Sequence, residues 1–268
     1  MIHKFRNVII KHYKKGTNPV NTAEFVEEGN VPKNTFSDRI NTMNYKNIQA
    51  GKFLSRPNRF IALVEINEKV ETCHVKNTGR CRELLIPGAT VFVQKADNQF
   101  RKTKYSVIGV IKEKRFINMD SQAPNKAVSE WLKRGGLFGD ITYLKPEKTY
   151  GNSRFDFYIE TEKEKIFMEV KGVTLEENGV VRFPDAPTER GVKHIRELCQ
   201  CLEDGYAAYL VFVVQMKDVT SFEPNDLTDP EFGKALREAA ECGVHILAVD
   251  CEVAMDSMVI MDKVPVHL

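Results

Sequence analysis

The chain has 268 residues, of which 42% are hydrophobic and 28% are charged, and its formal net charge at pH 7 is +2. These proportions are ordinary for a globular protein and exclude collagen, coiled-coil, mucin-like and wholly disordered chains. The best apolar run, 207–214, is too short for a membrane helix, and the N-terminal stretch lacks a secretory cleavage pattern, so no membrane partner is expected.

The charge is unevenly distributed along the chain. Residues 1–50 carry 8 Lys and Arg against 4 Asp and Glu, residues 51–120 carry 14 against 7, and residues 121–268 carry 17 against 26. A basic segment favours contact with a polyanion, whereas an acidic segment concentrates carboxylates that can hold a metal. The asymmetry therefore predicts two parts with different tasks.

The cysteines match neither a C-x-x-C pair nor zinc-site spacing. They are Cys73, Cys81, Cys199, Cys201, Cys242 and Cys251. This pattern favours free, mostly buried thiols in a reducing cytoplasm, which is the expected location of the protein.

Turn residues and apolar segments predict three regions. Residues 1–42 are polar and rich in turn signals, and we interpret them as a weakly ordered extension. Residues 43–120 contain short apolar strands separated by Gly, Pro and Asn, at 60–66, 70–75, 90–93 and 105–111. This region is expected to be a small five-stranded barrel of the oligonucleotide-binding (OB) type.

Residues 121–268 alternate strands and helices, which predicts an α/β part with a mixed, partly parallel sheet. Asn125 is expected to cap a helix over 126–134. Two further helices are expected, one from Thr188 to Gly205 and one from Asp229-Pro230 to Gly243. The expected strands are 154–160, 166–173, 207–215 and 244–249.

The first two of these strands predict a hairpin around the polar loop 161–164. The register that places apolar residues opposite one another pairs Ile159 with Ile166, Phe157 with Met168 and Phe155 with Val170. The same register places Asp156 opposite Glu169, and Lys171 shares the face of Glu169. Two carboxylates and a lysine are therefore expected on one sheet surface.

This arrangement suits hydrolysis of a phosphodiester. Asp156 and Glu169 would hold Mg²⁺ or Mn²⁺ through oxygen ligands, and the metal would polarise the phosphate and activate water. Lys171 would orient that water or stabilise the developing charge. A surface ion-pair cluster on a solvated strand explains the three residues equally simply, and both interpretations stay open at this point.

Basic and aromatic residues alternate in two segments, 52–60 and 100–105. Cations neutralise phosphates and aromatic rings stack on bases, so these segments predict a DNA-binding surface with mainly backbone contacts. Its candidate residues are Arg56, Arg59, Arg80, Arg101, Lys102 and Lys104. Exposed loops that are merely solvated are the alternative for the same residues.

The start of the helix expected at Thr188 offers free N–H groups, which form a natural phosphate site. Arg190 and Lys193 lie three residues apart on that helix and could flank a phosphate. A capping threonine beside solvated basic residues is the alternative. His194 is either a proton carrier or a packed helix residue.

Several strings of the sequence resemble the sugar fermentation stimulation protein A family of bacteria and archaea. They are Asn77-Thr78-Gly79, Tyr150-Gly151-Asn152-Ser153-Arg154-x-Asp156-Phe157, Glu169-Val170-Lys171-x-Val173-Thr174-Leu175 and Phe183-Pro184-Asp185-Ala186-x-Thr188-x-Arg190-Gly191-x-Lys193-His194. The resemblance covers about Met43 to Leu268. It implies an OB-type barrel over 43–120, a domain similar to the PD-(D/E)xK nucleases over 121–268, and DNA as the partner.

By this resemblance Asp156 is the first acidic ligand, Glu169 and Lys171 form the E-x-K pair, and Glu130 is the auxiliary acid on the preceding helix. A solvated helix glutamate is the alternative for Glu130. Two functions follow as hypotheses, a metal-dependent nuclease and a non-catalytic DNA-binding regulator of sugar metabolism. A homodimer is left open.

Overall fold

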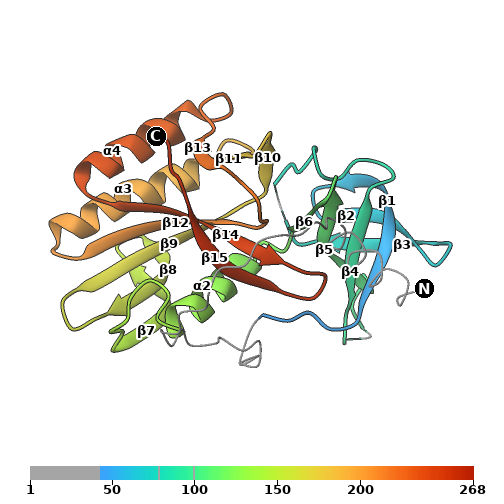
Figure 1. Cartoon of the computed structure of the whole chain (residues 1–268), viewed down its shortest axis with the longest axis horizontal. Helices are drawn as coiled ribbons and strands as arrows, with labels where there is room; N and C mark the ends of the chain where they lie inside the picture. Colours follow the sequence, from blue (N-terminus) through green and yellow to red (C-terminus); the bar gives the residue numbers. More distant parts are fainter. Residues whose placement is uncertain (1–42, 78, 99) are drawn as a thin grey trace, which may run out of the picture. The chain divides into compact units, whose positions relative to one another are not determined.

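The computed structural model describes residues 43–77, 79–98 and 100–268, which belong to one compact unit. The extension expected over 1–42 lies outside these residues. In chain order, the described part forms a small β barrel followed by a mixed sheet with three helices (Figure 1). The fold class expected from the sequence is confirmed.

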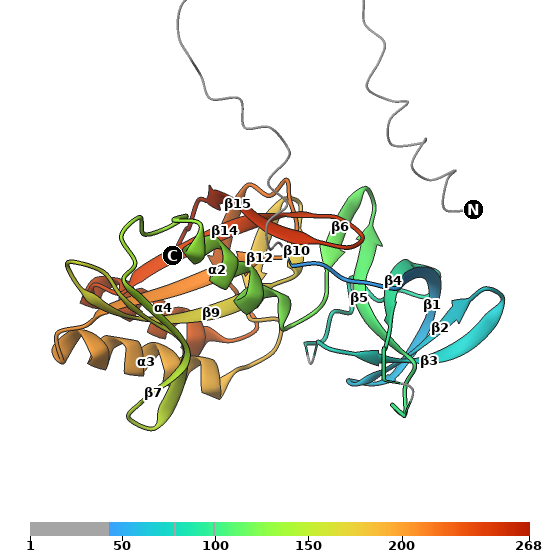
Figure 2. The same ribbon diagram turned by 90° about the horizontal axis from the view of Figure 1, so that it is seen from below.

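Five strands close the barrel in the order β3-β2-β1-β4-β5, and β5 pairs with β3 in parallel. They are β1 (Ile48–Asn58), β2 (Ile61–Ile66), β3 (Lys69–Val75), β4 (Thr90–Lys95) and β5 (Tyr105–Lys112). Alternate residues such as Val64, Val91 and Val110 are fully buried inside the barrel, as the two-residue period of a strand requires. Figure 2 shows β6 (Arg115–Asn118) beside β5, at the passage from the barrel to the sheet.

Two barrel strands have no counterpart among the strands expected from the sequence. β1 contains most of the basic segment 52–60, and Phe53 is its buried anchor. Charged and polar residues around Phe53 hide the alternation that marks a strand. The strand over 105–111 was expected to be the last one of this part. The turn after Lys112 instead continues into a short hairpin, which adds β6.

The second part is built on a six-stranded sheet in the order β15-β14-β12-β9-β8-β7. Its central strand β12 is parallel to both neighbours, and the other pairs are antiparallel. The strands are β7 (Tyr143–Tyr150), β8 (Ser153–Glu160), β9 (Lys165–Val173), β12 (Ala207–Val214), β14 (His245–Val253) and β15 (Met258–Val264). A separate small sheet contains β10 (Leu175–Glu177), β11 (Val180–Phe183) and β13 (Ser221–Pro224).

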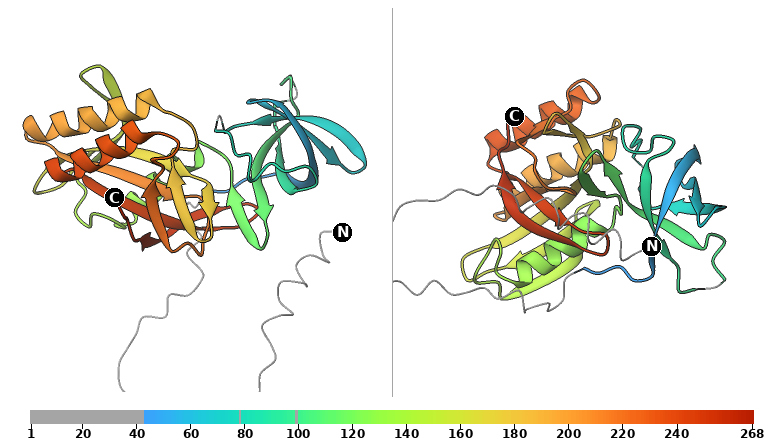
Figure 3. Two further views of the ribbon diagram at one scale, coloured as in Figure 1. Left: turned by 90° about the horizontal axis from the view of Figure 1, so that it is seen from above. Right: turned by 45° about the vertical axis from the view of Figure 1, so that its right-hand side comes forward.

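Helices cover both faces of the large sheet. On one face, α2 (Ala123–Lys133) shares a core with Met168 and Val211. The opposite face carries α3 (Glu189–Glu203) and α4 (Pro230–Cys242), which share a core with Phe212 (Figure 3). β9 and β12 are therefore buried on both sides, which explains the continuous apolar run along β12.

The signals for α3 and α4 are confirmed by the structure. The side chains of Thr188 and Asp229 cap the two helices by accepting hydrogen bonds from backbone N–H groups, and Gly243 ends α4 with φ +102°. The helix expected over 126–134 is present as α2, but its expected start is wrong, because Asn125 lies inside the first turn and Gln122 occupies the cap position. Pro124 can begin the helix because the first turn needs no N–H donor.

The predicted hairpin register holds for the part of each strand next to the loop, 157–160 of β8 and 165–168 of β9. Ile159 pairs with Ile166 and Phe157 with Met168, around the loop 161–164. The ladder ends there, so the predicted oppositions of Asp156 to Glu169 and of Phe155 to Val170 are both wrong. Phe155 packs in the core under α3, whereas Phe157 packs in the core under α2. The strand is therefore irregular at Asp156, and such irregularities re-aim side chains near functional sites.

Candidate active site

Asp156 lies where the ladder between β8 and β9 ends. Its carboxylate accepts a hydrogen bond from the Val170 backbone amide at 2.8 Å and another from the Asn125 side chain at 2.6 Å. Burial raises the pKa of Asp156 to about 6, and the nearby charge of Glu169 adds to the shift, against the opposing effects of both hydrogen bonds and Lys171. Asp156, Glu169 and Lys171 are therefore close enough to act on one another electrostatically.

Glu169 is only 3% exposed, and its two oxygens have different surroundings. Oε1 receives Lys171 Nζ at 2.5 Å and faces His194 Nδ1 at 2.5 Å. Oε2 is buried and has no hydrogen-bond partner among the described residues. Burial alone would raise the pKa of Glu169, but His194 and Lys171 outweigh it and hold that pKa below its usual value.

The hydrogen bonds of His194 set its tautomer. Arg190 Nε donates to His194 Nε2 at 3.4 Å, so Nε2 acts as the acceptor. Nδ1 then carries the proton and donates it to Glu169 Oε1. His194 is 4% exposed and lies on α3, so the helix holds the carboxylate of β9 in one orientation with Oε2 free.

These residues fit a hard divalent cation. A buried, unpartnered carboxylate oxygen is costly unless something positive meets it, and Asp156 supplies a second carboxylate beside it. The described residues hold no cluster of three His, Cys, Asp or Glu side chains suited to a metal. Mg²⁺ binds through one or two protein carboxylates and keeps several waters, so Asp156 and Glu169 are the two carboxylates that could hold it here.

The structure does not bring Glu130 to this site. Its carboxylate accepts a hydrogen bond from the backbone amide of Met43 at 2.9 Å. Burial raises the pKa of Glu130. The residue of α2 that reaches Asp156 is Asn125, which lies five residues earlier and therefore on a different side of the helix. The assignment of Glu130 as the auxiliary acid is corrected accordingly.

The candidates near the start of α3 lie in three different environments. The hydroxyl of Thr188 accepts the Gly191 amide at 3.0 Å and so caps the helix. Arg190 donates to His194, the residue that in turn donates to Glu169. Lys193 is exposed and donates to the carbonyl of Asn152 at 3.2 Å. Only Arg190 is linked to Glu169, and the link passes through His194.

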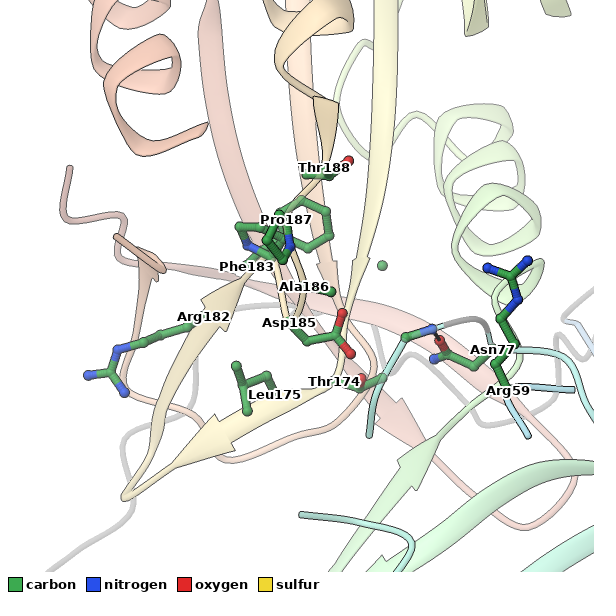
Figure 4. A pocket seen from close by; sticks show the side chains of 13 residues that line it. Arg59, Asn77, Thr174, Leu175, Arg182, Phe183, Asp185, Ala186, Pro187 and Thr188 are labelled. Carbon is green, nitrogen blue, oxygen red and sulfur yellow. Dashed lines mark hydrogen bonds between the residues drawn. The ribbon is translucent and has the colours of Figure 1, made fainter. Parts of the chain in front are cut away.

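A polar cleft of about 400 Å³ begins next to this site. Gly172, which follows Lys171, and Thr188, which caps α3, both line it, as does the barrel turn at Asn77 and Gly79. Figure 4 shows the carboxylate of Asp185 directed from the Phe183–Thr188 segment toward that turn. Asp185 Oδ2 accepts the Arg80 amide at 2.7 Å, so a carboxylate of the second part holds the barrel turn.

The turn requires glycine at position 79. A Cβ atom there would lie 2.4 Å from Asp185 Oδ2 and 2.9 Å from Asn77 Oδ1. The motifs N-T-G and F-P-D-A therefore meet in the structure, although the sequence separates Arg80 from Asp185 by 105 residues.

The basic candidates on the barrel divide into two groups. Arg56 donates to the carbonyls of Asn77, Gly79, Arg80 and Arg59, at 2.7–2.9 Å, so its guanidinium is occupied within the barrel. This is a correction to its assignment as a DNA contact. The remaining candidates are exposed and include Arg59, Arg80, Arg101, Lys102 and Lys104.

Sequence reasoning missed the roles of Asn125 and Asp185 and left that of His194 undecided. Asp185 and His194 belong to the longest motif, but their partners come from other segments and leave no local signal. Asn125 has the composition of a cap residue, which favoured the wrong interpretation.

Comparisons with known proteins cover both parts of the chain. Residues 54–119 match the family model described as the SfsA N-terminal OB domain, and residues 122–257 match the model described as the sugar fermentation stimulation protein RE domain. The chain belongs to the sugar fermentation stimulation protein family. The resemblance drawn from the motifs is thereby confirmed.

Members of this family from several organisms are similar over most of their length. Sugar fermentation stimulation protein homologs from Clostridium beijerinckii and Ruminiclostridium cellulolyticum are 64% and 61% identical over 226 residues, which cover 84% of this chain and 100% of each relative. The solved structure of Pyrococcus furiosus SfsA in complex with Ca²⁺ has 31% identity and a TM-score of 0.78. That match covers 85% of this chain and 100% of the other. Within the described residues, no helix has the length and apolar character needed to cross a membrane.

Proposed function

We propose that this member of the family binds DNA and hydrolyses phosphodiester bonds with Mg²⁺ or Mn²⁺. The observation that carries the proposal is the buried, unpartnered Oε2 of Glu169 beside Asp156 and Lys171. A cation needs such an oxygen as a ligand, and the hydrogen bond from His194 to Oε1 fixes the orientation of the carboxylate.

The relative from Pyrococcus furiosus supports a cation at this fold, since its structure is a complex with Ca²⁺. Ca²⁺ and Mg²⁺ are both hard cations that take oxygen ligands.

Each residue of the site has a distinct part in this proposal. Asp156 and Glu169 would hold the cation, which when bound polarises a phosphate and lowers the pKa of a water molecule. Lys171 Nζ lies 2.5 Å from Glu169 and can orient the attacking water or stabilise charge on the phosphate. Exposed cations of the barrel would bind the DNA backbone without reading bases, at Arg59, Arg80, Arg101, Lys102 and Lys104.

Cleavage assays test the proposal. Plasmid and labelled oligonucleotides are incubated with Mg²⁺ or Mn²⁺, and Lys171→Ala and Glu169→Gln are expected to lower the cleavage rate at least about 100-fold. Lys165→Ala is the matched control, because Lys165 is an exposed lysine on the same strand. Cleavage that survives both site variants, or that continues in excess chelator, would contradict the proposal.

A DNA-binding regulator without catalysis is the second candidate. One observation favours it, because both oxygens of Asp156 already accept hydrogen bonds from the protein. It predicts salt-sensitive DNA binding that is unchanged in Lys171→Ala, with no cleavage by the wild type under any divalent metal.

A further inference from the structure

We propose that the cleft between the Asn77–Gly79 turn and the Phe183–Thr188 segment receives one unpaired nucleotide of a DNA strand. This inference rests on the proposed DNA function and specifies its substrate, a single strand or an opened duplex end. The cleft is distinct from the acidic site, although the two adjoin at Gly172.

The cleft lies next to the acidic site. Among the residues that line it are Gly172, which follows Lys171 on β9, and Thr188, which caps α3. A strand with one phosphate at Lys171 would therefore have its neighbouring nucleotide at the cleft. The volume of about 400 Å³ lies in the range of pockets that enclose one small organic ligand. A stacked base pair cannot enter such a space, so a base must be unpaired to occupy it.

The lining of the cleft combines apolar and polar groups that suit a nucleotide. Leu175, Phe183 and Pro187 supply apolar surface for a sugar or base. Polar groups lie around them: Asn77 and Asp185 both line the cleft, and in Figure 4 the carboxylate of Asp185 is directed toward Asn77. Asn77 Oδ1 accepts the Gly79 amide at 2.8 Å, so its NH₂ group is the part left to donate to a ligand.

A cation and an exposed aromatic ring lie together beside the cleft. Arg59 lines the cleft, and its guanidinium carbon lies 4.7 Å from the centre of the Phe60 ring. Phe60 is 44% exposed, so its ring is accessible to a base. An exposed aromatic ring beside a cation is the pairing that stacks a base and neutralises its phosphate in proteins that bind single strands.

The test compares two DNA probes in chelator, where cleavage cannot interfere. The probes are a fluorescein-labelled oligo(dT) of about 20 nucleotides and the same strand annealed to oligo(dA), and fluorescence anisotropy gives the Kd of each. Ala186 lines the cleft, so Ala186→Trp fills it, whereas Ala186→Ser leaves it open. Leu175→Phe fills the same space from β10 and serves if Ala186→Trp fails to fold.

The filled variants are expected to bind oligo(dT) about tenfold more weakly than the wild type and the duplex within about twofold of it. Unchanged oligo(dT) affinity in a folded filled variant would overturn the inference, as would an equal loss for both probes. Arg101→Ala, in the loop between β4 and β5 and outside the cleft lining, is expected to weaken both probes alike. A wild-type protein that binds neither probe would refute the proposed DNA function itself, whereas binding without a cleft effect refutes only this inference.

Discussion

The carboxylate of Glu169 is held asymmetrically. Lys171 and His194 both donate to Oε1, while Oε2 remains buried without a partner among the described residues. His194 in turn accepts from Arg190 on the preceding turn of α3. His194 contacts the carboxylate of Glu169 and would act on a bound cation only through that carboxylate. We therefore regard it as a positioning residue. It orients a ligand in the way that outer residues orient metal-binding side chains.

Replacing His194 is expected to weaken cation binding. His194→Leu removes the donor to Oε1, so Glu169 loses its fixed orientation and the affinity for Mn²⁺ should fall about 10- to 100-fold. His194→Asn can still present an N–H group at the position of Nδ1 and should restore most of the affinity. Isothermal titration with Mn²⁺ measures both, and wild-type affinity in a folded His194→Leu protein would show that the histidine has only a packing role.

Arg56 illustrates how a basic residue can serve the fold instead of DNA. Its two NH₂ groups hold four backbone carbonyls around the Asn77–Arg80 turn. Arg56→Lys keeps the charge but loses the planar fork, so the free energy of unfolding should fall by about 2–3 kcal/mol. Urea denaturation measures the loss, with Arg101→Lys as the exposed control. An unfolding free energy within about 0.5 kcal/mol of the wild type would contradict this role.

At the scale of elements, α3 connects the cleft to the acidic site. Its cap residue, Thr188, lines the cleft, and its sixth residue, His194, reaches Glu169. The start of this helix therefore has to be fixed for the site to be ordered. Thr188 fixes it through its hydroxyl, which accepts the Gly191 amide, while its own amide donates to Asp229 at 2.8 Å.

Removal of this cap is expected to cost stability. Thr188→Ala should lower the free energy of unfolding by about 1 kcal/mol, and Thr188→Ser should restore it, because serine supplies the same acceptor. Chemical denaturation measures both variants. If Thr188→Ala instead leaves stability unchanged but weakens DNA binding, the hydroxyl acts on phosphate and not as a cap.

The elements that could be predicted are those whose signals are local. The caps of α3 and α4, the loop 161–164 and the buried run of β12 all follow from residues that are neighbours in sequence. The irregularity at Asp156 could not be predicted, because it depends on α2 supplying Asn125 from another segment. β1 was missed because charged residues on its outer face interrupt the apolar pattern.

The candidate site could be predicted only in part for the same reason. Glu169 and Lys171 lie on one strand face by the two-residue period, and their contact follows from spacing alone. His194, Asn125 and Asp185 join through contacts across the fold, which no period or motif spacing encodes. Thus the contact of Glu169 with Lys171 was accessible from the sequence, whereas the position of Asp156 and the residues that hold these side chains were not.

At the scale of the whole described part, a buried ion cluster joins the barrel to the second part. Lys112 and Arg115 of the β5–β6 hairpin contact Glu176 of β10 at 2.7 and 2.6 Å. Glu176 is 4% exposed, and it also accepts the Gly179 amide at 2.7 Å. Asp185, which contacts the barrel turn, and this cluster together hold the two walls of the cleft in place. Loss of the Glu176 cluster should therefore affect both the stability of the protein and the cleft.

The Glu176 cluster gives the protein a specific pH dependence of stability. Burial acts to raise the pKa of Glu176, but the Lys112 hydrogen bond, the Gly179 amide and Arg115 outweigh it and lower that pKa to about 2. A carboxyl group whose folded-state pKa is depressed stabilises the fold above its unfolded-state pKa, and this contribution is lost as the pH falls through the folded-state pKa. Glu176→Gln should therefore cost on the order of 2–3 kcal/mol near neutral pH.

The difference between the wild type and Glu176→Gln should narrow as the pH is lowered from about 7 to about 3, because protonation of the unfolded state removes the wild-type advantage. Urea denaturation at both pH values measures this. Glu177→Gln is the matched control, since Glu177 is 75% exposed, its pairing with Arg182 is long at 3.6 Å, and its loss should change stability by less than about 0.5 kcal/mol. A difference for Glu176→Gln that stays constant between the two pH values would mean that packing, and not the carboxylate charge, joins the two parts.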